Sequence, residues 1–250
     1  MQYHGSWPVK CLPCCASATL VLMNLIGAAP LAGASTVAIS CTVRAIYDVQ
    51  AQDTKDTSQV GVYGLINSQA SSIYPGKTLP GPRRSVGLLN DATGGYVLFG
   101  WVRDSVTVGR AVTYMEFRTA SGGVGSTLGT LLGNKTLKDN TWHGFKISYA
   151  GHGVWKEYLD GSNRALYSTP NLGFSGGHPF LRALRTNCDS GGNAHFENLK
   201  HFNTASSERL WSKNTCRLDT DPGKHLKIIS AHEDEVPSGQ NANGCAGTTT

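Results

Sequence analysis

Residues 142–160 read WHGFKISYAGHGVWKEYLD, and this stretch decides the fold class. Phe145 and Ile147 alternate with small or polar residues, and Val154–Leu159 returns after a Gly-His-Gly step. Side chains of a strand point alternately to its two faces, so alternation interrupted by a glycine-rich turn predicts a β-hairpin.

Similar runs recur along the chain, separated by turn residues. We expect further strands at 36–49, 59–66, 86–89, 96–103, 111–118, 180–186 and 194–202. The Gly/Ser-rich segment 120–129 is expected to connect strands. Charged residues make up only 16% and glycines number 30, while no segment keeps a helical period. The sequence therefore predicts an all-β protein, a sandwich or a barrel.

The N-terminus has the three-part layout of a secretory signal peptide. Residues 16–29 are apolar, Pro30 ends the run, and Ala32-Gly33-Ala34 supplies a small-x-small cleavage pattern. A membrane anchor is the alternative, but the run is short and is interrupted by Asn24. We expect a cleaved leader at 1–34, a β-sandwich domain at 35–216 and a disulfide-tethered tail at 217–250, and so a secreted, extracellular protein without a membrane contact.

Cleavage would leave an even number of cysteines, which in an exported chain suggests two disulfides. The candidates are Cys41, Cys188, Cys216 and Cys245. Three pairings are open; the pair nearest in sequence is Cys216 with Cys245. Free buried thiols are the alternative.

The charge pattern argues against a nucleic-acid partner. The formal net charge is +5, and Arg83-Arg84 is the only adjacent basic pair. A nucleic-acid-binding surface would show a basic stripe with interleaved aromatic residues.

Five motifs stand in order along the chain: YVLFGW (96–101), YMEF (114–117), DNTWH (139–143), WKEYLDG (155–161) and FENL (196–199). Their order resembles exported proteins of the concanavalin A-like lectin/glucanase fold. Within that fold the nearest resemblance is to the glutamic peptidases (eqolisins) and their bacterial relatives.

The resemblance implies an antiparallel two-sheet β-sandwich of jelly-roll type, with a concave face that binds an extended glycan or peptide. It also implies a catalytic Gln at the position of Leu98 and a catalytic Glu within 180–187. Leu98 cannot activate water, and 180–187 contains no carboxylate. Both departures argue against peptidase activity.

No motif for another reaction is present. Glycoside hydrolysis needs two carboxylates flanking the bond, and the carboxylates nearest to aromatic strand positions are Glu116, Glu157 and Asp160. A cluster in the tail, with His232 and Glu233, offers metal ligands, but solvated charge is the simpler interpretation. We expect no catalytic residue, no cofactor and no metal.

We therefore favour a secreted, non-catalytic sandwich that binds an extended extracellular ligand, polysaccharide before peptide. The expected contacts are Trp101, Tyr114, Glu116 and Arg118, because large aromatic faces suit sugar C–H groups. The alternatives are a diverged hydrolase, either a glutamic-type peptidase or a glycan-cleaving enzyme, and a structural protein whose aromatic residues all fill the core. The oligomeric state is left open.

Overall fold

The structure is a computed structural model. It describes residues 46–55, 58–68, 72–73, 82–103, 110–128, 136–186, 189–190, 193–204, 207–219 and 227–236. The predicted leader and three of the four candidate disulfide cysteines, Cys41, Cys188 and Cys245, lie outside the described residues. Cys216 is disulfide-bonded and lies against the core, and its pairing stays a prediction.

The first sheet is antiparallel, with seven strands among the described residues. In spatial order they are β15 (Asn214–Asp219), β1 (Ile46–Asp53), β11 (His178–Thr186), β4 (Arg83–Asn90), β5 (Gly95–Arg103), β6 (Ala111–Arg118) and β7 (Val124–Leu128).

The second sheet is also antiparallel. Its order is β10 (Tyr167–Ser168), β9 (Val154–Leu159), β8 (Trp142–Gly151), β2 (Gly61–Asn67), β13 (Ala194–Phe202), β17 (Glu233–Val236) and β16 (Lys227–Ser230), with β14 (Glu208–Leu210) also on β13. A separate two-stranded ribbon joins β3 (Ser72–Ile73) to β12 (Asp189–Ser190).

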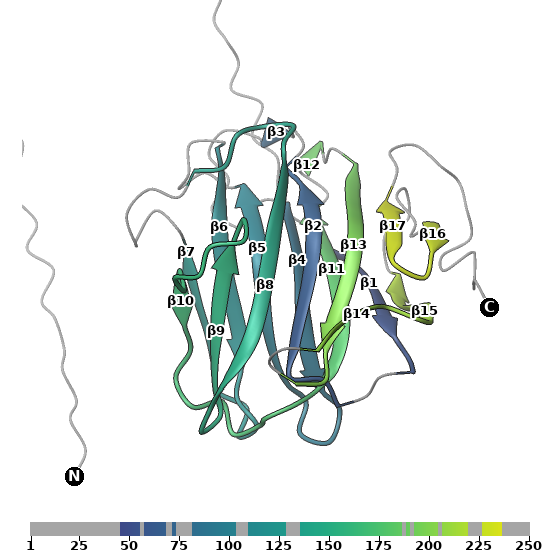
Figure 1. Ribbon diagram of the computed structural model, residues 1–250. Coiled ribbons are helices and arrows are strands. Elements are labelled where there is room, and N and C mark those ends of the chain that lie inside the picture. Colours follow the sequence, from purple (N-terminus) through teal and green to yellow (C-terminus); the bar gives the residue numbers. More distant parts are fainter. Residues whose placement is uncertain are drawn as a thin grey trace, which may run out of the picture. The chain divides into compact units, whose positions relative to one another are not determined.

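The two sheets stack face to face, with β8, β2 and β13 in front of β5, β4 and β11 (Figure 1). This arrangement confirms the predicted antiparallel two-sheet β-sandwich. Strands β16 and β17 lie within the range predicted as a tail, and β17 pairs with β13. Among the described residues, no helix has the length and apolar character needed to cross a membrane.

The predicted hairpin is confirmed as β8 and β9, with Phe145 opposite Leu159. His152 and Gly153 form its two-residue turn, with φ of 53° and 73°. Positive φ at both central residues is the geometry of the turn that matches the twist of paired strands. The hairpin therefore follows directly from local sequence.

The segment 120–129 was expected to be a connection, and this expectation is wrong. Within it, β7 pairs with β6 along the edge of the first sheet, from Val124 opposite Arg118 to Leu128 opposite Tyr114. A Cβ on Gly125 would lie 2.4 Å from the Phe117 ring, so only glycine lets that ring lie over the edge strand. Gly125 therefore does not mark a loop: the strand needs a glycine there because the Phe117 ring packs against it.

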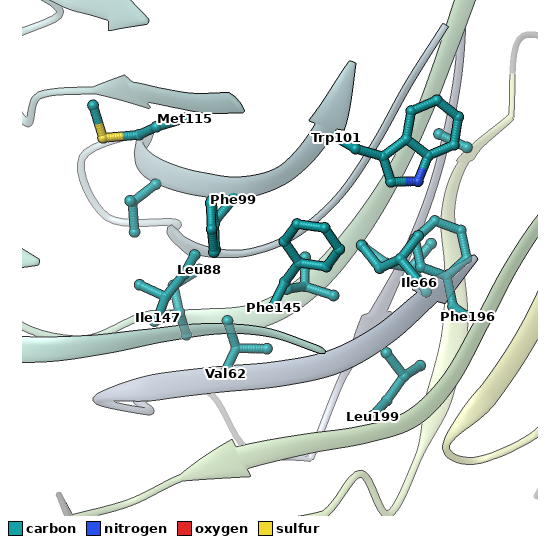
Figure 2. Close-up of a cluster of buried hydrophobic side chains, with 14 of the residues drawn as sticks. Val62, Ile66, Leu88, Phe99, Trp101, Met115, Phe145, Ile147, Phe196 and Leu199 are labelled. Carbon is teal, nitrogen blue, oxygen red and sulfur yellow. The ribbon is translucent and has the colours of Figure 1, made fainter. Parts of the chain in front are cut away.

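The core fills the space between the sheets and draws on both (Figure 2). Phe99 of β5 meets Phe145 of β8 edge to face, with ring centroids 5.0 Å apart. Trp101, from β5, lies over Ile66 and Phe196 of the second sheet (Figure 2). Each large apolar side chain buried in this way stabilises the fold by about 1.5–3 kcal/mol.

Candidate functional site

The strands of the first sheet sort their side chains onto two faces. On β6, Met115 faces the core, while Tyr114, Glu116 and Arg118 lie on the opposite side. We call this second side, turned away from the second sheet, the outer face. Three of the four predicted contacts, Tyr114, Glu116 and Arg118, therefore lie on the outer face.

Glu116 lies at the centre of a hydrogen-bonded network on the outer face. Its carboxylate accepts hydrogen bonds from the hydroxyl of Tyr96 at 2.7 Å and that of Tyr114 at 3.1 Å. It also accepts from Nη1 of Arg83 at 2.8 Å and Nη1 of Arg182 at 3.2 Å. Two phenols and two guanidinium groups therefore saturate one carboxylate.

The network continues across the sheet through Arg182. Its Nε and Nη2 donate to the two oxygens of Asp48, at 3.1 Å and 2.7 Å, in a bidentate pair. Gln50 donates to the same carboxylate at 3.1 Å. One guanidinium thus bridges Asp48 on β1 and Glu116 on β6, two carboxylates from distant parts of the chain.

These contacts fix the charge states. Burial alone would raise the pKa of Glu116, but the Tyr96 hydroxyl and the charges of Arg182 and Arg83 outweigh burial and lower it. Burial would lower the pKa of Arg182, but Asp48 and Glu116 raise it above its ordinary value. Burial, reinforced by the Glu116 charge, raises the pKa of both Tyr96 and Tyr114. At neutral pH, Glu116 is an anion beside a cation and has no proton to give.

Beside this network, the outer face is hollowed by a cavity of about 310 Å³. Its floor is an apolar cluster of Leu89, Leu98 and Phe180, with Tyr96 packed against it. Three guanidinium groups and one amide line the rest, and we call it the outer-face cavity. The described lining residues are Gln50, Leu89, Gly94, Tyr96, Leu98, Arg118, Phe180, Arg182 and Arg217.

Two of the four predicted contacts are buried, which corrects their assignment. Trp101 is 1% exposed and faces the core, where its Nε1 donates to the carbonyl of Asn67. Tyr114 is 2% exposed: it packs with Val102 and Val112, and the guanidinium of Arg83 lies over its ring, 5.2 Å from the centroid. Neither is open to a ligand on the outer face.

The other two predicted contacts remain candidates. Arg118 is exposed and lines the outer-face cavity. Glu116 lies beneath the surface, with 15% of its side chain exposed, and acts on the cavity through Arg182. Their contact with a ligand stays a prediction.

Sequence reasoning missed most of the cavity lining, including Gln50, Arg182 and Arg217. One signal was available: Phe180 and Arg182 are two residues apart on an expected strand and so share a face. The resemblance implied a catalytic Glu on this strand. The strand instead presents Phe180 and Arg182 to the cavity, and Leu98 lines the cavity beside them.

Glu157, the other strand carboxylate considered, lies inside the core. It is 0% exposed, and neither of its oxygens has a hydrogen-bond partner among the described residues. Burial raises the pKa of Glu157 well above its ordinary value. It is separate from the outer-face cavity and has no access to a ligand there.

A trio on the second sheet offers atoms that suit a metal ion. One ligand atom from each of His195, Glu197 and Glu233 lies within 4.8 Å of the others. His195 Nε2 is 3.1 Å from Glu233 and 3.6 Å from Glu197, so contact of both carboxylates with the imidazole accounts for this arrangement. Asp234, from the same tail cluster, is buried and accepts a hydrogen bond from Asn214.

No protein-family model and no curated protein matches this chain. Solved structures of similar fold include Scytalido-glutamic peptidase with a peptide-based transition-state analogue, at 10% identity and a TM-score of 0.48, with 78% of this chain and 100% of that chain covered. SCP-B, an eqolisin peptidase bound to a tripeptide, has 9% identity, a TM-score of 0.48 and the same coverage. A family 16 endo-glucanase from Bacteroides ovatus has 10% identity and a TM-score of 0.38, with 56% of this chain and 66% of that chain covered. These groups are the ones that the sequence resembles, and the likeness is one of fold alone.

Proposed function

We propose that this protein is a secreted, non-catalytic β-sandwich that binds an extended extracellular ligand, in the first place a polysaccharide, on the outer face of its first sheet. The observation that carries the proposal is the outer-face cavity. It combines an apolar floor, the ring of Tyr96, the amide of Gln50 and several guanidinium groups. Flat apolar surface with convergent hydrogen-bond donors suits a sugar ring and its hydroxyl groups.

The charge state of the network supports binding without catalysis. A glycoside hydrolase needs a carboxylic acid whose pKa is raised so that it can protonate the leaving group. The pKa of Glu116 is lowered instead, and Asp48 is held by the same guanidinium. Among the described residues, no carboxylate lines the cavity.

A diverged hydrolase is the second candidate, and one observation favours it. Asp48 and Glu116 approach one guanidinium from opposite sides on a single sheet face. Cleavage of a glycosidic bond normally requires two carboxylates that flank the bond. In that case Arg182 would have to release one of them.

The test is a glycan microarray probed with the full chain and two tyrosine variants. Tyr96→Ala removes the aromatic wall of the cavity, and Tyr63→Ala removes a half-buried tyrosine from the second sheet as a matched control. We expect the wild type and Tyr63→Ala to bind the same polysaccharides and Tyr96→Ala to lose about tenfold in affinity.

Three results would overturn the proposal. Equal binding by Tyr96→Ala would move the site away from the outer-face cavity. New reducing ends or peptide fragments, lost in Glu116→Gln, would establish a hydrolase. Absence of binding to any glycan or peptide, together with absence of cleavage, would leave a structural protein.

A further inference from the structure

We infer that the ligand of the outer-face cavity is an acidic polysaccharide, one whose sugar residues carry carboxylate groups, such as a polyuronate. The inference rests on the proposed function and specifies its ligand. Its basis is the charge of the lining: Arg118, Arg182 and Arg217 face the cavity, and no described carboxylate does.

The three arginines differ in how far other groups satisfy them. Arg182 is committed to Asp48 and Glu116, which lie beneath it. Arg118 is exposed and makes no ion pair with any residue that the structure describes. Among the described residues, the contacts of the Arg217 guanidinium are Asp91, at 3.6 Å, and the side-chain oxygen of Gln52, at 3.3 Å. A guanidinium has five N–H donors, so Arg118 and Arg217 retain donors for an anion.

The positions of these arginines give the site a direction. Arg217 belongs to β15 and Arg118 to β6, and the strands β1, β11, β4 and β5 lie between them. The backbones of β15 and β6 are five inter-strand steps apart, about 24 Å, while the side chains of Arg118 and Arg217 both reach the one cavity between them. The cavity thus crosses the strands, and a polymer lying across them with several anionic groups can meet both guanidinium groups.

An acidic peptide is the competing ligand, and the geometry disfavours it. Peptides bind sheets chiefly by adding a strand at an edge, where backbone groups are unpaired. The central strands β11, β4 and β5 are each paired on both sides, so their backbone groups are engaged in the ladder. Recognition on this face depends on side chains alone. Guanidinium, amide and phenol groups suit a polymer that presents carboxylates and hydroxyls.

The test is titration calorimetry of the full chain with oligogalacturonate and with the same oligomer after its carboxylates are reduced to alcohols. Polyglutamate is the third titrant. We expect the carboxylated oligomer to bind at least tenfold more tightly than the reduced one, and its affinity to fall as salt is added.

Two variants locate the effect. Arg118→Gln and Arg217→Gln should each weaken binding of oligogalacturonate about tenfold and weaken binding of the reduced oligomer much less, so that the difference in affinity between the two titrants narrows. Arg164→Gln, an exposed arginine after β9 in the second sheet, is the control and should bind like the wild type.

The failures are distinguishable. If both oligomers bind equally and Tyr96→Ala abolishes both, the ligand is a neutral glycan; the inference falls and the proposed function stands. If polyglutamate binds and both oligomers do not, the partner is an acidic peptide and the inference falls. If neither these titrants nor the glycans of the microarray bind, the proposed function itself fails.

Discussion

Glu116 receives hydrogen bonds from Tyr96, Tyr114, Arg83 and Arg182, so both of its oxygens are occupied before any ligand arrives. A carboxylate in this position holds cations and hydroxyl groups in place. It orients Arg182 toward the outer-face cavity and is itself only 15% exposed. The Glu116 carboxylate therefore holds the guanidinium of Arg182 in place at the cavity.

Trp101→Ala should destabilise the protein and leave ligand affinity unchanged. Its indole is buried among both sheets, and truncating a large core side chain costs about 3–5 kcal/mol. Urea denaturation measures the loss in the free energy of unfolding. A normal free energy of unfolding with lost binding would put Trp101 back on the ligand face.

Trp101 also shows that the sequence pattern does not determine which face of a strand packs in the core. The strand 96–103 carries large apolar residues on both faces, with Leu98 and Val102 on one side and Phe99 and Trp101 on the other. Alternation therefore does not say which face is the core. Glu116 and Arg118 lie two residues apart on an expected strand, so their shared face follows from local sequence without knowledge of the partner strands.

At the scale of elements, the outer-face cavity depends on Gly87 of β4. A methyl group there would lie 2.5 Å from the carbonyl oxygen of Val97 and 2.6 Å from Leu98. Gly87→Ala should therefore cost about 1–3 kcal/mol of stability and weaken ligand binding, because Leu98 and Phe180 must move into the cavity.

Thermal unfolding and calorimetric titration measure both effects. Gly123→Ala is the control, because its methyl group would meet only the Thr119 side chain, 3.2 Å away at the nearest, at an exposed turn. Unchanged affinity of Gly87→Ala for the ligand would show that the ligand does not enter the outer-face cavity.

Asp53, at the end of β1, ties the two sheets together. It is fully buried, accepts hydrogen bonds from the amides of Lys55 and Ser212, and lies 3.4 Å from His201 of β13. Asp53→Ala should cost about 3–5 kcal/mol, because it removes one partner from a buried network. Urea denaturation measures it. Glu208→Ala, which removes a partly exposed ion pair with Lys200, is the control and should cost less than about 1 kcal/mol.

Elements differ in how far sequence determines them. The β8–β9 hairpin was predictable because its turn and its alternation are local. The pairing of β1 with β11 was not, since it joins Ile46 to Thr186 and depends on the whole sandwich. The network missed in the site, Asp48 with Arg182, depends on the same distant pairing.

At the scale of the molecule, four buried or partly buried carboxyl groups predict an acidic optimum of stability. Glu157 and Asp234 have raised pKa values, that of Asp234 reaching about 7 chiefly through burial. Their contribution is complete below about pH 4 and is lost as pH rises. Asp53 and Glu116 have lowered pKa values, so their contribution is lost as pH falls below about 4.

The melting temperature should therefore be highest near pH 4–5 and decline toward neutral pH. Differential scanning calorimetry across this range measures it. Glu157→Gln combined with Asp234→Asn should flatten the neutral side of the profile, because these two groups then no longer titrate. A melting temperature that rises steadily to pH 7 in the wild type would contradict the assignment.

The strand order β15-β1-β11-β4 has a consequence for how the molecule is made. β1 leaves the ribosome before both of its neighbours, β11 and β15. A loop of more than a hundred residues must therefore close before β1 is paired on either side. Topologies of this kind fold slowly, in milliseconds to seconds. The wall of the cavity that includes Gln50 and Arg217 therefore forms only after β15 has been synthesised. A nascent polypeptide halted before Arg217 would contain most of the sandwich and only part of the proposed site.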